Sequence, residues 1–236
     1  MIILLTPTGG RQRQFELCMQ WMKQQTYSGK VVWVVIDDCE PKTTDTLTED
    51  FRDTWSIIKR HPNPLWERGS NTQVRNLRIG IDIVKAFPSN WVEAIFIIED
   101  DDYYKPEYLQ TMVEMLQGYS VAGEIKTIYY NLKYKTYKDN ANINHSSLFQ
   151  TCFTVDAIPI FEKCLNISNR NNSFVDINFF KQAQNVNLFD KGKLAIGMKG
   201  MPGRAGIGSG HRVMGTRDSD LNKLKELIGE DYKFYQ

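Results

Sequence analysis

The sequence predicts a single α/β domain in which helices flank a doubly wound, mixed sheet. Three observations support this prediction. Short apolar runs alternate with helical patterns along residues 1–117, as in chains that build parallel sheets. The 236 residues, 42% of them hydrophobic, suit one large core. Neither a fixed-period repeat nor a Ser/Pro linker divides the sequence, so we expect residues 1–236 to fold as one domain.

Residues 1–117 follow an alternating pattern of strands and helices. Four apolar runs have the composition of buried strands: residues 2–5, 31–36, 56–59 and 94–98. Three segments space their apolar residues as helices do: residues 11–25, 74–84 and 106–116. Sheets of this kind bind ligands at the carboxyl ends of their strands. Those ends carry the polar segments 6–11, 37–38 and 99–102, which makes them the candidate site.

Residues 118–236 are less regular. Two segments have strand composition and two have helical spacing: residues 125–134 and 148–155, then 157–165 and 175–183. Residues 191–217 hold six Lys/Arg, eight glycines and no Asp or Glu. This composition predicts a flexible, basic loop that could approach an anionic ligand.

The overall composition excludes disordered, collagen-like and coiled-coil chains. Lys+Arg 29 and Asp+Glu 28 leave a formal net charge of +1, so any site for a polyanion must be local. The four cysteines form no CxxC pair, which is typical of reduced thiols. The longest apolar run, residues 31–36, is too short to span a bilayer. We therefore expect a cytoplasmic protein without a membrane-spanning segment.

Four adjacent acids, Glu99, Asp100, Asp101 and Asp102, directly follow a predicted buried strand. Neighbouring carboxylates repel one another, and a bound cation is the simplest reason to keep them together. Oxygen ligands favour a hard ion, Mg²⁺ or Mn²⁺. The alternative is a solvated acidic turn that precedes a helix.

Two further strand ends carry polar candidates. Of Asp37 and Asp38, one could cap a turn while the other accepts a hydrogen bond from a nucleobase N–H or a ribose hydroxyl; a turn role for both is the alternative. The glycine turn before Arg11 could offer backbone N–H groups to a phosphate.

The basic loop and an aromatic strip complete the candidates. Lys199, Arg204 and Arg212 could hold phosphate oxygens, and His211 could supply a nitrogen ligand to the metal. The alternative is a mobile surface loop. Residues 129–138 interleave aromatic and basic side chains, as in a nucleic-acid-binding strip or a mixed edge strand.

Together these segments resemble the family 2 glycosyltransferases of the GT-A fold. Leu5-Thr6-Pro7-Thr8 with Arg11, followed by residues 24–27 and 34–38, is similar to the nucleotide-binding start of that family. Residues 69–81, which include Arg75, are similar to the segment beside the donor. Residues 97–109 look like the strand end that carries the DxD motif, although its first acid is Glu99.

The resemblance implies a nucleotide-diphospho-sugar donor such as UDP-glucose, bound by residues 1–117, with residues 118–236 as the acceptor half. Asp38 would read the base, most often uracil, and Asp100 would lie near the ribose. The candidate donor-binding residues are Thr6, Pro7, Thr8, Arg11, Asp38, Arg75, Asp100, Arg204 and Arg212. The candidate ligands for Mn²⁺ or Mg²⁺ are Glu99, Asp101, Asp102 and His211.

An inverting transfer also needs a carboxylate that deprotonates the acceptor hydroxyl. The family places it at the start of a helix after the acceptor-side strands, and Asp176 has that context. A helix start keeps a carboxylate ionised, although Asp176 could merely cap the helix. Asp156 and Glu162 are weaker alternatives for the base.

Two other functions remain open at this stage. A sugar-phosphate nucleotidyltransferase also combines a Gly-rich start with acidic metal ligands, but its longer signature is incomplete after Gly9-Gly10-Arg11. A module that binds nucleotide sugars without turnover is the non-enzymatic alternative. The acceptor could be a saccharide or a modified base in phage DNA.

Overall fold

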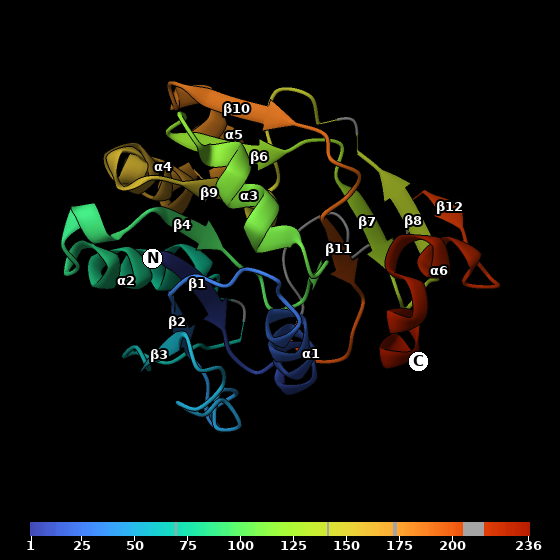
Figure 1. The fold of residues 1–236 in the computed structure, drawn as a ribbon. Helices are drawn as coiled ribbons and strands as arrows, with labels where there is room; N and C mark the ends of the chain where they lie inside the picture. The colour runs from blue at the N-terminus through green and yellow to red at the C-terminus, as the bar shows by residue number, and fades with distance from the viewer. Residues whose placement is uncertain (69, 141, 172–173, 205–214) are drawn as a thin grey trace.

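The protein is described here by a computed structural model, which defines residues 1–68, 70–140, 142–171, 174–204 and 215–236. Its main element is a seven-stranded mixed sheet (Figure 1). The strands, in spatial order, are β10 (Val186–Phe189), β6 (Val121–Glu124), β9 (Thr151–Phe153), β4 (Ala94–Ile97), β1 (Ile2–Thr8), β2 (Val31–Asp37) and β3 (Trp55–Arg60). All neighbouring pairs are parallel except those that involve β9.

Helices cover both faces of this sheet, as the sequence predicts. Side chains of α1 (Gln12–Lys23) and α3 (Tyr108–Leu116) pack with Ile2 and Leu4 of β1 in one core cluster. Side chains of α2 (Gln73–Lys85), α4 (Ile158–Asn171) and α5 (Val175–Gln182) form the other cluster with Ile3 and Leu5. Successive residues of β1 thus face opposite layers, which explains why this strand is apolar throughout.

A second, five-stranded sheet was not predicted. Its strands, in spatial order, are β12 (Thr216–Arg217), β8 (Thr136–Asp139), β7 (Ile128–Asn131), β11 (Ala195–Lys199) and β5 (Tyr103–Tyr104). It lies beside β6 and β10 in Figure 1, with α6 (Asn222–Ile228) and the C-terminus next to it. Strand β11 has all five residues buried, so the prediction that residues 191–217 form one loop is wrong there.

Two predicted strands are also shorter than expected. The strand over residues 125–134 is confined to β7, because Lys126 adopts a positive φ of 59° just before it. The strand over 148–155 is β9 alone, between the 3₁₀ turns Leu148–Gln150 and Val155–Ala157. Further 3₁₀ turns span Ser89–Trp91 and Gly229–Tyr235.

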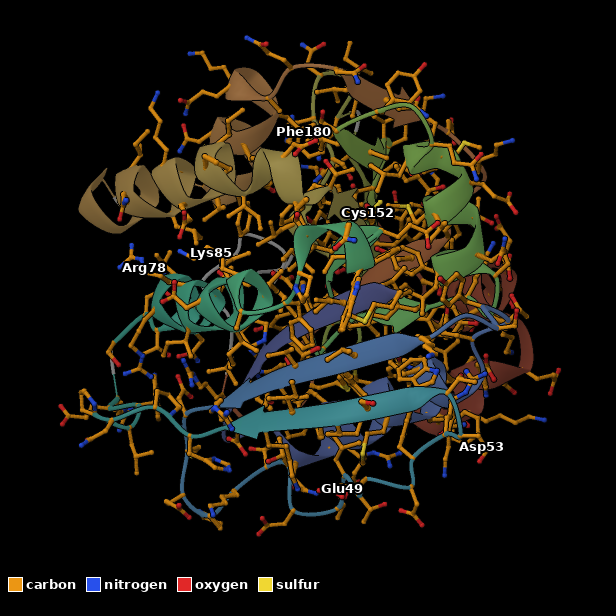
Figure 2. All side chains as sticks on the ribbon, turned by 60° about the vertical axis from the view of Figure 1, so that its left-hand side comes forward. Glu49, Asp53, Arg78, Lys85, Cys152 and Phe180 are labelled. Atoms are coloured by element: carbon orange, nitrogen blue, oxygen red, sulfur yellow. The ribbon has the colours of Figure 1, made fainter. Side chains whose placement is uncertain are left out.

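The cysteines are free, as the sequence predicts. Cys18, Cys152 and Cys164 are buried, and Figure 2 shows Cys152 inside the molecule, whereas Glu49 and Asp53 lie on the periphery. Within the described part of the chain, no helix combines the length and hydrophobicity needed to cross a membrane.

The parallel register brings three strand ends to one edge of the main sheet. Thr8 at the end of β1 pairs with Asp37 at the end of β2, and Leu5 pairs with Ile97 at the end of β4. The chain after each strand therefore enters the same region, which contains Asp38 and the acids that follow β4.

Candidate functional site

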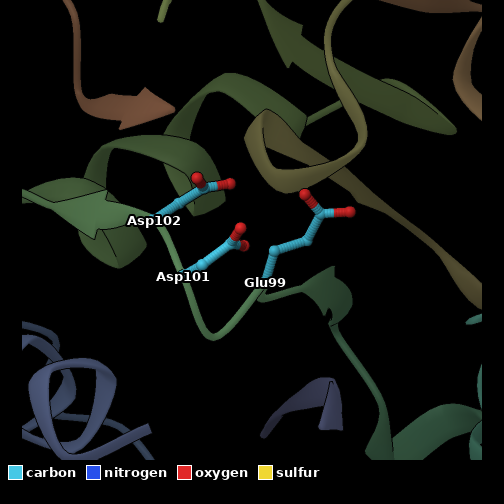
Figure 3. A group of neighbouring side chains, drawn as sticks. All are labelled: Glu99, Asp101 and Asp102. Atoms are coloured by element: carbon cyan, nitrogen blue, oxygen red, sulfur yellow. The ribbon is translucent and has the colours of Figure 1, made fainter. Parts of the chain in front are cut away.

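The acids after β4 form a compact group. Oxygen atoms of Glu99, Asp101 and Asp102 all lie within 4.8 Å of one another, and their carboxylates are drawn close together in Figure 3. Asp100 is not part of this group. It accepts a hydrogen bond of 2.5 Å from the Thr8 hydroxyl and lies 3.3 Å from the Arg11 guanidinium.

Among the described residues, Lys199 and Arg11 bring positive charge to these acids. The ammonium of Lys199 lies 2.8 Å from Asp102 and 3.2 Å from Asp101, while Arg11 also lies 3.5 Å from Asp101. Lys199 is the last residue of the buried strand β11, so the second sheet positions the Lys199 ammonium beside these acids. Lys199, which the sequence offers as a ligand for phosphate oxygens, is enclosed and paired with these acids.

Burial penalises the charged form of these carboxyls. It raises the pKa of the Asp100 carboxyl to about 6 and also raises the pKa values of Glu99 and Asp102, although Arg11 and Lys199 act in the opposite direction. One oxygen of Asp102 is buried without a hydrogen-bond partner among the described residues. The all-oxygen donor set of Glu99, Asp101 and Asp102 suits a hard divalent ion such as Mg²⁺ or Mn²⁺.

The acids after β2 have separate tasks. Asp37 accepts hydrogen bonds from the backbone N–H and hydroxyl of Thr44, at 3.0 and 3.1 Å, and thereby caps a turn. Asp38 is fully buried. Its carboxylate accepts hydrogen bonds from the side chains of Arg204 at 2.6 Å, Arg75 at 3.2 Å and Asn76 at 2.8 Å. The Thr72 hydroxyl donates to it as well.

The remaining donor-site candidates differ in their burial and in the acids that they contact. Thr6 and Pro7 are buried in β1, and the Thr6 hydroxyl accepts a hydrogen bond of 2.9 Å from Trp33. Thr8 and Arg11 contact Asp100, one of the acids after β4. Arg75 and Arg204 form ion pairs with Asp38. His211 and Arg212 lie outside the described residues.

Asp176 lies in the first turn of α5. Its carboxylate accepts a hydrogen bond of 2.8 Å from the backbone of Ile177 and another from the backbone of Leu148. Burial raises the pKa of Asp176, whereas the charge of His145 lowers it, and the charge of Asp176 in turn raises the pKa of Glu99. The helix start and the acids after β4 are thus close enough to interact electrostatically.

Sequence reasoning missed several residues of this site. Thr72 and Asn76 bind Asp38, His145 lies near Asp176, and Trp66 stacks on Arg204 at 4.5 Å. The spacing of Asn76 on α2 after Thr72 was the available signal, because residues four apart share one face of a helix. Trp66 and His145 have no comparable sequence pattern around them.

The mixed α/β sheet with its flanking helices is a glycosyltransferase fold. Among the solved structures with a similar fold are those of the S. aureus glycosyltransferase TarS. Its residues 1–349 in complex with UDP match with a TM-score of 0.55 and 11% identity, over 84% of this chain and 60% of that one. The complex with UDP-GlcNAc gives a TM-score of 0.54 and 11% identity, over 84% and 58%.

This chain therefore spans about three fifths of the length of these TarS structures. No family model matches the sequence, and no curated protein does either. At this identity the similarity establishes the fold, and the activity has to be argued from the site.

Proposed function

We propose that the protein is a GT-A glycosyltransferase of family 2, which transfers a sugar from a nucleotide-diphosphate donor to an acceptor hydroxyl. One observation carries the proposal: carboxylate oxygens of Glu99, Asp101 and Asp102 lie within 4.8 Å of one another at the ligand-binding edge of a glycosyltransferase fold. The TarS structures contain UDP or UDP-GlcNAc, which supports a UDP-sugar such as UDP-glucose as the donor.

In this proposal, residues 1–117 bind the donor and residues 118–236 bind the acceptor. Glu99, Asp101 and Asp102 would hold Mn²⁺ or Mg²⁺, which supplies positive charge to the leaving nucleoside diphosphate. Asp38 would accept the N–H of the base at the end of β2. Arg11 lies between the acids and the Gly9–Gly10 turn, where it balances charge beneath the diphosphate.

Asp176 is the proposed general base of an inverting transfer. Its carboxylate accepts hydrogen bonds from the backbone N–H of Ile177, at the start of α5, and from that of Leu148. These bonds orient the carboxylate and favour the ionised form that accepts a proton. Phe174 and Ile177 beside it are 57% and 45% exposed. Because apolar and aromatic side chains pack against the faces of sugar rings, this surface favours a saccharide acceptor over a DNA base.

A screen of nucleotide sugars for Mn²⁺-dependent hydrolysis tests the donor without knowledge of the acceptor. We expect UDP release from a UDP-sugar, and loss of that release in Asp101→Asn. Asp190→Asn is the matched control, since Asp190 is exposed and pairs with Lys126 at 2.7 Å. Pyrophosphate-dependent formation of UTP would instead identify a nucleotidyltransferase, and tight UDP binding without turnover would identify a binding module.

A further inference from the structure

The guanidinium of Arg204 occupies a defined place at the end of β2. One of its nitrogens donates to an Asp38 carboxylate oxygen at 2.6 Å, and another donates to the Thr72 hydroxyl at 2.7 Å. Its Cζ atom lies over the Trp66 ring, 4.5 Å from the ring centroid. The side chain is only 16% exposed, so this is an enclosed position.

Trp66 is fixed beside Asp38 by its own hydrogen bonds. Its backbone N–H donates to the Asp38 carbonyl at 2.7 Å, and its indole N–H donates to the Ser70 carbonyl at 2.9 Å. Both N–H donors of the residue are thereby used, and these hydrogen bonds orient the ring without a contribution from Arg204. A ring held in this way presents a preformed stacking face next to a buried carboxylate.

The chain that carries Arg204 crosses the turn between β1 and α1. The Gln14 amide donates to the Pro202 carbonyl at 2.7 Å, and the Arg204 N–H bonds the Gly10 carbonyl at 3.4 Å. Gly9 permits this close approach, because a Cβ at that position would lie 2.2 Å from the Asp38 carboxylate and 3.3 Å from Arg204. Arg204 therefore enters the same region that the proposed function gives to the nucleotide.

A planar group that stacks on an aromatic ring and donates an N–H to a carboxylate makes the contacts that a nucleobase would make there. We infer that the contacts of Arg204 with Asp38 and Trp66 mark the base subsite, that Trp66 is the stacking surface for the base, and that the base must displace the guanidinium to bind. This inference rests on the proposed function. It assigns Arg204 to competition with the base, where the sequence suggests a phosphate ligand.

Displacement leaves Asp38 well satisfied. Its second oxygen keeps the Thr72 hydroxyl, Asn76 at 2.8 Å and Arg75 at 3.2 Å, while the oxygen released by Arg204 becomes available to an incoming N–H. When a site is open in only a fraction of the molecules, the apparent affinity for its ligand is the intrinsic affinity multiplied by that fraction. Removal of the guanidinium should therefore strengthen the binding of a nucleoside.

Calorimetric titration of uridine and UDP into Arg204→Met tests this. We expect uridine to bind about tenfold more tightly than in the unaltered protein, as for a site that is open a tenth of the time. Arg78→Met is the matched control: Arg78 lies on α2 at the periphery, bonds Asn166 at 2.7 Å and should leave both affinities unchanged (Figure 2). Trp66→Leu, added to Arg204→Met, should cost about tenfold in uridine affinity, since one stacked base is lost.

The opposite results separate the alternatives. If Arg204 binds the diphosphate, Arg204→Met weakens UDP and leaves uridine unchanged, which overturns the inference. Uridine binding by the unaltered protein with no gain in Arg204→Met also overturns it, while the proposed function stands. If neither protein binds uridine or UDP, the proposed function fails together with the inference.

Discussion

At the scale of single residues, Lys199 decides the charge balance of the site. It is buried, and it contacts Asp101 and Asp102 at 3.2 and 2.8 Å. Lys199→Met should lower the free energy of unfolding by about 3–5 kcal/mol in the presence of a chelator, because it leaves buried carboxylates without their counter-charge. Urea denaturation measures this loss.

The control for Lys199 is a lysine with an exposed partner. Lys126 pairs with Asp190 at 2.7 Å on the surface, so Lys126→Met should cost less than about 1 kcal/mol. Mn²⁺ should raise the melting temperature of Lys199→Met more than that of the unaltered protein, since the ion replaces the lost charge. An equal rise in both would show that the acids do not bind the ion.

Gly9 is a second residue whose role follows from geometry. Its φ is +149°, and a Cβ there would meet the Asp38 carboxylate at 2.2 Å. Gly9→Ala should therefore weaken UDP binding at least tenfold by displacing Asp38, whereas Gly118→Ala, with φ of +79° and open space around it, should change stability by about 1 kcal/mol and leave binding intact. Equal UDP affinity in Gly9→Ala would contradict this placement of the site.

At the scale of elements, the start of α5 carries the proposed base. Asp176→Asn preserves a side-chain oxygen that can cap the helix but removes the proton acceptor. Turnover with a sugar acceptor should fall about 10²–10⁴-fold, while stability changes by less than about 1 kcal/mol and UDP affinity is kept. Asp156→Asn, in a neighbouring 3₁₀ turn, should keep normal turnover. Near-normal turnover in Asp176→Asn would exclude the role and favour a retaining mechanism.

The elements also show what sequence patterns can predict. Strands β1, β2 and β4 lie between two helical layers, so each is a continuous apolar run that is visible without a structure. Strands β5 and β12 have two residues each, too few for any periodicity. The hydrophobic pattern of β11 is interrupted by Gly197 and ends at Lys199. Lys199 is charged because its side chain contacts Asp102, 97 positions earlier in the chain. Such partners are set by the tertiary fold and leave no local signal.

At the scale of the whole molecule, the same principle limits what can be predicted about the site. The acids were recognisable because they follow strands, and the strand ends of a parallel sheet meet at one edge. Their partner cations were not recognisable, because Lys199 lies at the end of β11 in the second sheet and Arg204 lies in the chain that follows β11. The sequence patterns therefore grouped the acids, whereas the pairing of each acid with its cation is set by the tertiary fold.

The stability of the whole molecule should depend on pH through these buried acids. Burial raises the pKa of Asp100 from 3.8 to about 6, and raises those of Glu99 and Asp102. The folded protein then binds more protons than the unfolded chain between roughly pH 4 and 6, so its stability falls as pH rises through that range. In the presence of a chelator, we expect the melting temperature to fall by roughly 5 °C as the pH rises through this range.

Two comparisons isolate that effect from the other titrating groups. The pKa values of Asp190 and Asp218 are lowered, which gives stability the opposite pH dependence, but their contribution is the same with and without metal. Mn²⁺ compensates the charge that develops on the acids after β4, so melting curves recorded at pH 4.5 and 6.5 should show a smaller fall with the ion than with the chelator. Asp100→Asn should also reduce the fall. If the fall is equal under both conditions and in Asp100→Asn, the acids after β4 carry no excess charge, and the argument for a divalent ion at Glu99, Asp101 and Asp102 is lost.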